Sequence, residues 1–304
     1  MNLQQLRYLC AIVHAEFNLS HAAKTLNTSQ PGVSRYVQLL EAELGVKLLI
    51  RDKKRITGLT PAGNAIAEAA NHVVRHAVNI RSIAKDYQQN VVRKLTVATS
   101  DNHARYTLPA VIERFVKMNP SIAINLRQGS LKQIENWVRN GEADLYIANP
   151  AEPILDFSLL RCHELHRIVL TPVGHPLLSK EKVGLEDLAR YPIMTRHQVV
   201  GDFHARGLAP QIALTAIDAD LMKSYVEAGL GIAIVSHTVF NRRIDRKLRA
   251  IDARHLFAPK IVYVGAPRHT YLSKHAIQFI QLFAPHLGLD QIERTFRYDP
   301  LIPR

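Results

Sequence analysis

The first 90 residues of the chain repeat apolar side chains at steps of three and four, which is the spacing of one buried helix face. The first such face consists of Leu3, Leu6, Leu9, Cys10 and Val13. The pattern breaks at Phe17–Ser20, where Ser20 is a suitable N-cap for a short second helix that ends at Leu26. Two helices joined by a tight turn are therefore expected here.

A third helix and a hairpin follow. A Ser or Thr cap closely followed by Pro, as in Thr28–Pro31, signals a helix start because Pro has no N–H to leave unpaired. Gly45 ends this helix, whose buried stripe contains Val33, Tyr36, Val37, Leu40 and Leu44. From Val46 to Leu59, two short apolar runs flank a charged tip, which predicts a β-hairpin, or wing, with a basic end.

Thr60–Gly63 repeats the cap-and-proline signal and opens a helix that we extend to about Gln89. Its apolar stripe is continuous and consists of Ile66, Ala69, Ala70, Val73, Ala77, Ile80, Ala84 and Tyr87. Such a helix would be roughly 40 Å long, and it has no core of its own to cover the stripe. Pairing with a second copy of the chain would bury the stripe, so we expect a homodimer.

Beyond Arg93, strand-like runs alternate with helical ones. Strands are expected at Lys94–Thr99, Ile122–Arg127, Asp144–Ala148, His166–Thr171, Ile193–Thr195, Ile212–Thr215, Gly231–Ser236 and Lys260–Gly265. Helices are expected at Tyr106–Met118, Leu131–Asn140, Leu185–Arg190, Asp218–Ala228 and Ser273–Phe283. Short connections between such alternating elements predict an α/β domain with a mainly parallel sheet.

The expected fold class is α/β, with a winged helix-turn-helix at residues 1–60, a linker helix at 61–90 and the α/β domain at 91–304. A chain of 304 residues suits two or three domains. We find no apolar run of about 18 residues and no basic n-region followed by an apolar h-region. Neither a membrane span nor a signal peptide is therefore expected, and the protein should stay in the cytoplasm.

The formal net charge is +13 and the sequence pI is about 9.9. A protein this basic often has a polyanionic partner, most often nucleic acid, although charge alone leaves a basic protein without such a partner open. The two cysteines, Cys10 and Cys162, form no CxxC pair, so neither a disulfide framework nor a zinc site is suggested.

The helix from Gln30 to Leu44 would enter the major groove of double-stranded DNA. Gln30 can pair with adenine and Arg35 with guanine, while the basic wing would add affinity and salt dependence. The residues that we expect at DNA are Ser20, Ser29, Gln30, Pro31, Ser34, Arg35, Arg51, Lys53, Lys54, Arg55 and Thr60. The alternative is a three-helix interaction module with a solvated basic loop.

The DNA-binding half closely resembles the LysR family of bacterial transcription regulators. The resemblance is carried by Phe17–Ala23, Ser29–Ser34, Leu39, Glu41, Leu44–Gly45 and Leu59–Gly63. It implies a winged helix-turn-helix, a dimerising linker helix and a two-lobed co-inducer domain of the periplasmic-binding-protein type. It also implies a homodimer or homotetramer, with RNA polymerase as a candidate partner.

The C-terminal half resembles the cysteine-regulon activator (CysB-type) branch of that family. The matching segments are Ala104–Pro109, Gln128–Ser130, Gly174–Leu177, Asp218–Asp220, Gly229–Gly231 and Phe283–Leu287. The resemblance implies a co-inducer from sulfur metabolism, such as acetylserine or a sulfate-like anion. It places lobe I at about 91–163 and 267–290, and lobe II at about 164–266.

An effector pocket is expected between the lobes, near strand ends where backbone groups and helix N-termini converge. Its expected residues are Ser100, Asn102, His103, Gln128, Gly129, Asn149, Thr195 and Gly201. The branch carries Thr-Thr-His-Thr-Gln where this chain has Thr99–His103, and another Thr at Asn149. The loop Arg196–Gly201 is also shorter than in the branch. A regulator of another pathway, which senses an unrelated carboxylate or anion, is therefore the alternative.

Other functions find less support in the sequence. A transport-type solute-binding protein would suit the two lobes but not the N-terminal module. No catalytic constellation surrounds Ser100, so no enzyme is expected. His72 and His76 are spaced for a metal, but no third ligand is apparent and we expect neither metal nor cofactor. A thiol redox sensor would need Cys10 and Cys162 to reach each other.

Overall fold

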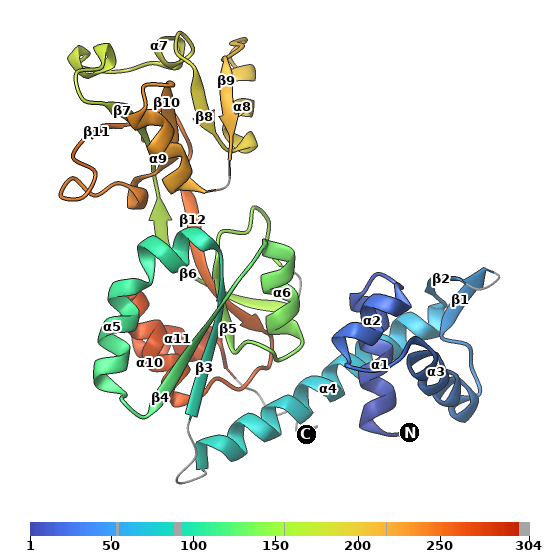
Figure 1. Cartoon of the computed structure of the whole chain (residues 1–304). Coiled ribbons are helices and arrows are strands. Elements are labelled where there is room, and N and C mark those ends of the chain that lie inside the picture. The colour runs from blue at the N-terminus through green and yellow to red at the C-terminus, as the bar shows by residue number, and fades with distance from the viewer. Residues whose placement is uncertain (53–54, 88–92, 155, 217, 298–304) are drawn as a thin grey trace.

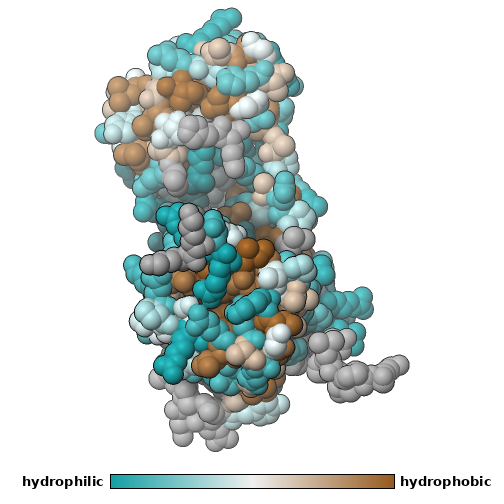
Figure 2. All heavy atoms as spheres, turned by 90° about the vertical axis from the view of Figure 1, so that its right-hand side faces the viewer, coloured by the Kyte–Doolittle hydropathy of each residue, from teal (hydrophilic) through white to brown (hydrophobic). Residues whose placement is uncertain are grey.

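The computed structural model describes residues 1–52, 55–87, 93–154, 156–216 and 218–297. An N-terminal module lies to one side of a two-lobed body, and a long helix joins the two (Figure 1). The lobes are stacked, which gives the molecule the elongated outline in Figure 2. None of the described helices is long and apolar enough to cross a membrane.

The N-terminal module is a winged helix-turn-helix, as predicted. Its elements are α1 (Leu3–His14), α2 (Leu19–Thr25), α3 (Gln30–Leu44), β1 (Leu49–Asp52) and β2 (Arg55–Leu59). Ser29 caps α3 by accepting a hydrogen bond from the Gly32 amide, and Gly45 ends the helix in the left-handed region at φ 68°. Both were expected from the cap chemistry. Lys53 and Lys54, expected at the wing tip, lie outside the described residues.

The predicted N-cap of the second helix is wrong. The helix begins at Leu19, and Asn18 is its cap because Asn18 Oδ1 accepts a hydrogen bond from the His21 amide at 3.0 Å. Ser20 lies inside the first turn, where its hydroxyl donates to Gln30 Oε1 at 3.3 Å. An Asn two residues earlier offers the same capping chemistry, so the sequence pattern alone could not separate the two starts.

A buried carboxylate joins α3 to the wing. Glu41 is 4% exposed, and its Oε1 accepts hydrogen bonds from the amides of Leu48 and Leu49 at 2.8 and 3.1 Å. Nearby, Gly63 in the first turn of the linker helix approaches Leu48 so closely that a Cβ would lie 2.0 Å from the Leu48 carbonyl oxygen. Two residues of the family pattern therefore hold the wing against the helices.

The linker helix is α4 (Pro61–Tyr87). Its first turns pack on the N-terminal core through Ala67 and Ala70, which are buried with Leu9 and Leu40. Farther along, Val73, Ile80 and Tyr87 of the predicted stripe remain 48%, 66% and 83% exposed in the single chain.

Lobe I contains a five-stranded sheet in the order β4-β3-β5-β12-β6. Its strands are β3 (Arg93–Thr99), β4 (Ile122–Gln128), β5 (Leu145–Ala148), β6 (Phe157–Leu165) and β12 (Lys260–Pro267). Its helices are the π-helical turn η1 (His103–Thr107), α5 (Pro109–Met118), α6 (Leu131–Arg139), α10 (Lys274–Phe283) and α11 (Leu289–Thr295). In Figure 1, α5, α10 and α11 lie on one side of the sheet and α6 on the other.

Lobe II contains a second five-stranded sheet in the order β11-β7-β10-β8-β9. Its strands are β7 (Arg167–Pro172), β8 (Ile193–Thr195), β9 (Ile212–Thr215), β10 (Ile232–Ser236) and β11 (Leu248–Asp252). Its helices are η2 (Pro176–Ser179), α7 (Leu185–Leu188), α8 (His197–His204), α9 (Ala219–Glu227) and η3 (His237–Val239).

The sheets correct the predicted topology in two ways. Strands β3, β4 and β5 are parallel as expected, but β12 is antiparallel to β5 and β6, and β7 is antiparallel to β10 and β11. Strand β12, assigned to lobe II from the sequence, pairs within lobe I. The antiparallel pairing of β12 with β6 and its place in lobe I have one cause: the chain returns from lobe II along β12, beside the strand by which it left.

Besides the short turns η2 and η3, four elements were not expected from the sequence: β6, β11, α8 and α11. The sequence predicts a loop at Arg196–Gly201, but in the structure Arg196 precedes α8 and the rest of the segment forms its first turns. Burial of Val199 and Phe203 against lobe II stabilises this helix, and such tertiary packing outweighs the low helix propensity of its Val and Gly residues.

The buried carboxylate yields the first prediction. Glu41→Ala leaves two buried amides without their acceptor, which should cost about 2–3 kcal/mol of local stability. Hydrogen exchange of the peptides that cover residues 46–60 should accelerate accordingly. Glu68→Ala, at an exposed position of α4, is the control. Equal exchange in the two variants would show that Glu41 does not hold the wing.

Candidate functional site

The first candidate surface is the exposed face of the N-terminal module. Gln30, Pro31 and Arg35 are exposed on α3, and Ser34 is half-buried. Arg51 and Arg55 are exposed on the wing, which projects from the module away from the two lobes (Figure 1). The Thr60 hydroxyl forms two hydrogen bonds within the module: it donates to the Lys47 carbonyl at 2.6 Å and accepts from the Gly63 amide at 2.9 Å.

The second candidate site is a cavity of about 470 Å³ between the lobes. Six of the eight residues expected in an effector pocket line it: Ser100, Asn102, His103, Gln128, Gly129 and Asn149. They come from the carboxyl ends of the parallel strands β3, β4 and β5, which meet at one edge of the lobe I sheet. The sequence therefore located the lobe I wall of this cavity.

Thr195 and Gly201 are not among the residues that line the cavity. Thr195 is fully buried in β8, where its hydroxyl donates to the Ile234 carbonyl at 3.2 Å. Gly201 lies on the exposed side of α8. Arg196, the residue after Thr195, lines the cavity instead, because it directly follows the end of β8.

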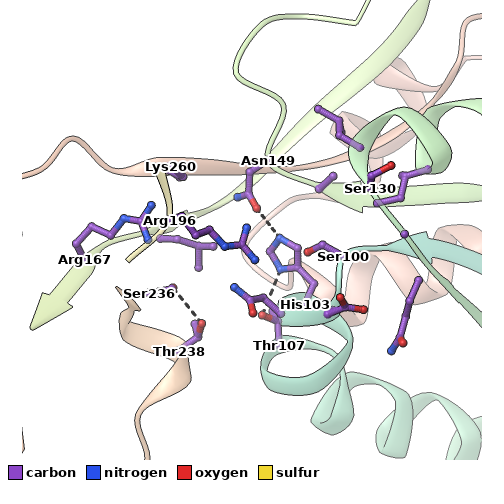
Figure 3. Close-up of a pocket in the computed structure, with 18 of the residues that line it drawn as sticks. Ser100, His103, Thr107, Ser130, Asn149, Arg167, Arg196, Ser236, Thr238 and Lys260 are labelled. Carbon is purple, nitrogen blue, oxygen red and sulfur yellow. Dashed lines mark hydrogen bonds between the residues drawn. The ribbon is translucent and has the colours of Figure 1, made fainter. Parts of the chain in front are cut away.

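His103 is the buried centre of the lobe I wall. Asn149 Nδ2 donates to the Ile261 carbonyl at 3.1 Å, so its Oδ1 is free to accept from His103 Nε2 at 2.8 Å. Nδ1 of the neutral ring then accepts from the Thr107 hydroxyl at 3.3 Å. Figure 3 shows this chain of side chains at the middle of the cavity. Burial is the main cause that lowers the pKa of His103; the hydrogen bond to Asn149 opposes this shift, and the charges of His163 and Arg196 add to it.

Three cations on the other side of the cavity were missed by the sequence analysis. Arg167, Arg196 and Lys260 gather there in Figure 3, opposite Ser100 and Ser130. Burial lowers the pKa of all three. Mutual repulsion adds to this effect, because Arg196 lowers the pKa of Arg167, and both lower that of Lys260.

The backbone explains why these cations meet. Lys260, the first residue of β12, pairs in register with Leu165, the last residue of β6. Arg167 begins β7 only two residues later. A signal was present in the sequence, since each cation stands at or next to a predicted strand end, but residues so far apart are brought together only by the sheet pairing.

A cluster of partly dehydrated like charges favours an anionic ligand, because an anion replaces the lost hydration and relieves the repulsion. Asp101, whose negative charge could oppose such a ligand, is exposed at the rim and raises the pKa of Arg196. Ser100, Ser130 and Thr238 add hydroxyl groups to the lining. The cavity is thus suited to a small polar molecule that carries negative charge.

Neither metal chemistry nor thiol chemistry has a comparable site in the described part of the chain. No group of three or more His, Cys, Asp or Glu residues there could hold a metal ion. Cys10 is buried in the N-terminal core and Cys162 in the lobe I core. Burial raises the pKa of Cys10 to about 12 and that of Cys162 to about 11, which disfavours the reactive thiolate.

Comparisons with known proteins agree with this architecture. The family model described as "Bacterial regulatory helix-turn-helix protein, lysR family" matches residues 3–64, and the one described as "LysR substrate binding domain" matches residues 88–288. The HTH-type transcriptional regulator SsuR of Burkholderia cenocepacia is 39% identical over 98% of this chain and 99% of its own length. CysB of the same organism is 38% identical over 98% of this chain and 97% of its own length.

A solved structure matches the two-lobed body. The cofactor-binding domain of the Cbl transcriptional regulator superposes with a TM-score of 0.63 and 29% identity, covering 70% of this chain and 98% of that structure. These relatives are transcriptional regulators rather than enzymes, in agreement with the expectation from the sequence.

The buried imidazole leads to a pH prediction. Because the pKa of His103 is lower in the folded chain than its ordinary value near 6.5, its contribution to stability is complete above that value and is lost as the pH falls below it. Thermal unfolding from pH 7.5 to pH 5.0 should show a smaller loss for His103→Gln than for the unmodified chain. His204→Gln, at an exposed position, should keep the full loss. Identical pH profiles for all three proteins would contradict the prediction.

Proposed function

The chain belongs to the LysR family of bacterial transcriptional regulators, and we propose that it binds promoter DNA as a homo-oligomer under the control of a small anion in the interlobe cavity. The observation that carries the proposal is the convergence of Arg167, Arg196 and Lys260 on that cavity. The same chain presents exposed Gln30 and Arg35 on its helix-turn-helix. One chain therefore combines a DNA-reading surface with a site for a charged signal.

We propose that the regulated pathway is sulfur assimilation or cysteine metabolism. The resemblance to the cysteine-regulon branch and the 38% identity to a CysB protein support this assignment. Sulfate-like anions, or acetylserine through its carboxylate, suit a cationic cavity. A regulator of another pathway with an unrelated carboxylate ligand is the second candidate. It is favoured by the pairing of His103 with Asn149, since these residues replace two polar side chains of the branch.

We propose that α4 pairs with a second copy of the chain. The large exposed side chains of Val73, Ile80 and Tyr87 recur at seven-residue spacing, so they lie on one side of the helix. Pairing of α4 with the same helix of a second copy would bury these side chains. In the mechanism that we propose, ligand binding shifts the lobes relative to each other, and the spacing of the paired DNA-binding modules changes with them.

The ligand class is tested by thermal unfolding of the full chain with acetylserine, sulfate, thiosulfate, adenosine phosphosulfate and unrelated carboxylates. A ligand at 100 times its dissociation constant should stabilise the chain by about 2.7 kcal/mol, which is a shift of a few degrees. A shift with sulfur compounds alone would support the sulfur pathway. A shift only with another acid would favour the second candidate.

Arg167, Arg196 and Lys260, which we call the cleft cations, give a sharper prediction. Arg196→Gln and Lys260→Gln should each weaken binding of the stabilising anion by about tenfold or more, because each removes one favourable charge from a partly dehydrated site. Arg196→Lys should retain part of the affinity, and the exposed Lys182→Gln should retain all of it. Titration calorimetry measures the effect. Unchanged affinity in both cleft variants would exclude this cavity as the anion site.

The DNA surface is tested by salt dependence. On non-specific duplex DNA, Arg55→Gln should lower the slope of log K against log salt by about one, as expected for loss of one phosphate contact. Arg35→Ala should instead cost about 1–3 kcal/mol on a promoter fragment selected by the protein and relax its base preference. The exposed Arg114→Gln in α5 is the control for both. An unchanged slope for Arg55→Gln would remove the wing from the proposed interface.

A further inference from the structure

A second cavity, of about 390 Å³, lies where the N-terminal module, the linker helix and lobe I meet. We call it the junction cavity. Figure 1 shows the place, where α4 passes from the module to the base of the lower lobe. The polar side chains that matter for its chemistry are Arg7, Arg75, Asn79, Arg81, Arg139 and Thr270. They come from α1, α4, the end of α6 and the segment after β12.

Arg75 is the most informative of these residues. It is 8% exposed, and its guanidinium donates to the Arg268 carbonyl at 2.8 Å. No carboxylate of a described residue lies within ion-pair distance of it. Asp156 helps at longer range, but that carboxylate is mostly exposed and stands 4.0 Å from Arg139. A buried guanidinium with so little negative charge around it is costly to desolvate.

The rest of the lining increases the positive charge. Arg7 and Arg81 are exposed at the mouth and form no ion pair with a described residue. Burial lowers the pKa of Arg75, and the neighbouring charge of Arg139 lowers it further. The hydroxyl of Thr270 is buried and has no hydrogen-bond partner among the described residues. A donor without an acceptor therefore lines the same cavity as the cations.

Each of the two acidic residues in the lining has a partner in lobe I. Glu142 forms an ion pair with Arg127 at 2.6 Å. Asp144 accepts a hydrogen bond from the Thr96 amide at 2.7 Å. Both carboxylates thus have partners in lobe I, whereas Arg7, Arg75 and Arg81 form no ion pair with a described residue.

We propose that the junction cavity is a second ligand site, which binds a small oxoanion of the sulfate, phosphate or carboxylate type between Arg7, Arg75 and Arg81. Guanidinium groups bind such oxygens with paired N–H donors, and the Thr270 hydroxyl supplies a further donor. The site is spatially separate from the interlobe cavity, since no residue lines both cavities.

The buried polar residues of the site and the most exposed apolar residues of α4 lie on different sides of the helix. Arg75, Asn79 and Ser82 follow one another at steps of four and three, so they share a helix face. Val73 and Ile80 point to nearly the opposite side, because two residues of an α-helix turn by about 200°. Ala77, which belongs to the apolar stripe, also lines the cavity, so the site borders the proposed dimer face.

An anion at this site would link the DNA-binding module to lobe I. Arg7 belongs to α1 of the module, whereas Arg139 and Thr270 belong to lobe I. Any change in the relative placement of these parts must alter the affinity for the anion, and anion binding must bias that placement equally. The site therefore couples anion concentration to the orientation of the DNA-binding module.

The test uses the full chain with two of the cleft cations removed, Arg196→Gln/Lys260→Gln, so that anion binding in the cleft does not contribute. Titration calorimetry with inorganic sulfate, inorganic phosphate and acetate, each against chloride at constant ionic strength, should show one bound anion per chain. Adding Arg7→Gln/Arg81→Gln should weaken this binding by about tenfold or more. Arg75→Gln should abolish it, and Arg114→Gln should leave it unchanged.

The outcomes are distinct. Preference for sulfate or phosphate over acetate would identify a tetrahedral oxoanion, and the reverse would identify a carboxylate. Arg7 and Arg81 are exposed, so their variant should fold even if Arg75→Gln does not, and unfolding curves verify this. Absence of binding by all three anions in the cleft variant would overturn the proposal. Binding that persists unchanged in Arg7→Gln/Arg81→Gln would overturn it as well.

Discussion

The passage of the chain between the two lobes is the constraint on which the cleft depends. β6 leads into β7 through a single residue, His166, and β12 returns beside it with Lys260 opposite Leu165. These adjacent connections hold the facing edges of the lobes together. They also place cations from separate strands at the cleft, where burial and mutual repulsion lower their pKa values.

The N-terminal module obeys a different constraint, which is local. A buried carboxylate at Glu41 organises the amides that begin the wing, and Gly63 permits the linker helix to start against the Leu48 carbonyl. The polar surface of α3 and the wing can then face outward without loss of core packing. The long linker helix extends the module toward lobe I and keeps a row of apolar side chains exposed. The geometry therefore supports both DNA binding and association of chains.

Positive charge is concentrated at three places in the molecule. It is exposed on the wing, partly buried in the cleft, and gathered again where the module meets lobe I. The high net charge, which suggested nucleic acid, thus has three separate locations with different solvation. Exposed arginines of the wing suit a phosphate backbone, whereas the more enclosed groups suit small anions, because desolvation strengthens their electrostatic interactions.

The sequence by itself determined whatever depends on residues close together along the chain. Caps, prolines and helical spacing predicted α3, the wing and α4, and strand ends predicted that Ser100, His103, Gln128 and Asn149 face one cavity. Only the tertiary structure decided the mixed topology of the sheets, the helix at His197–His204 and the inward turn of Thr195. It alone brought Arg167, Arg196 and Lys260 together, and likewise Arg7 and Arg75. The physical reason is that local propensity depends on short-range backbone chemistry, whereas burial, strand pairing and clustering of charge arise from contacts between residues far apart in the chain.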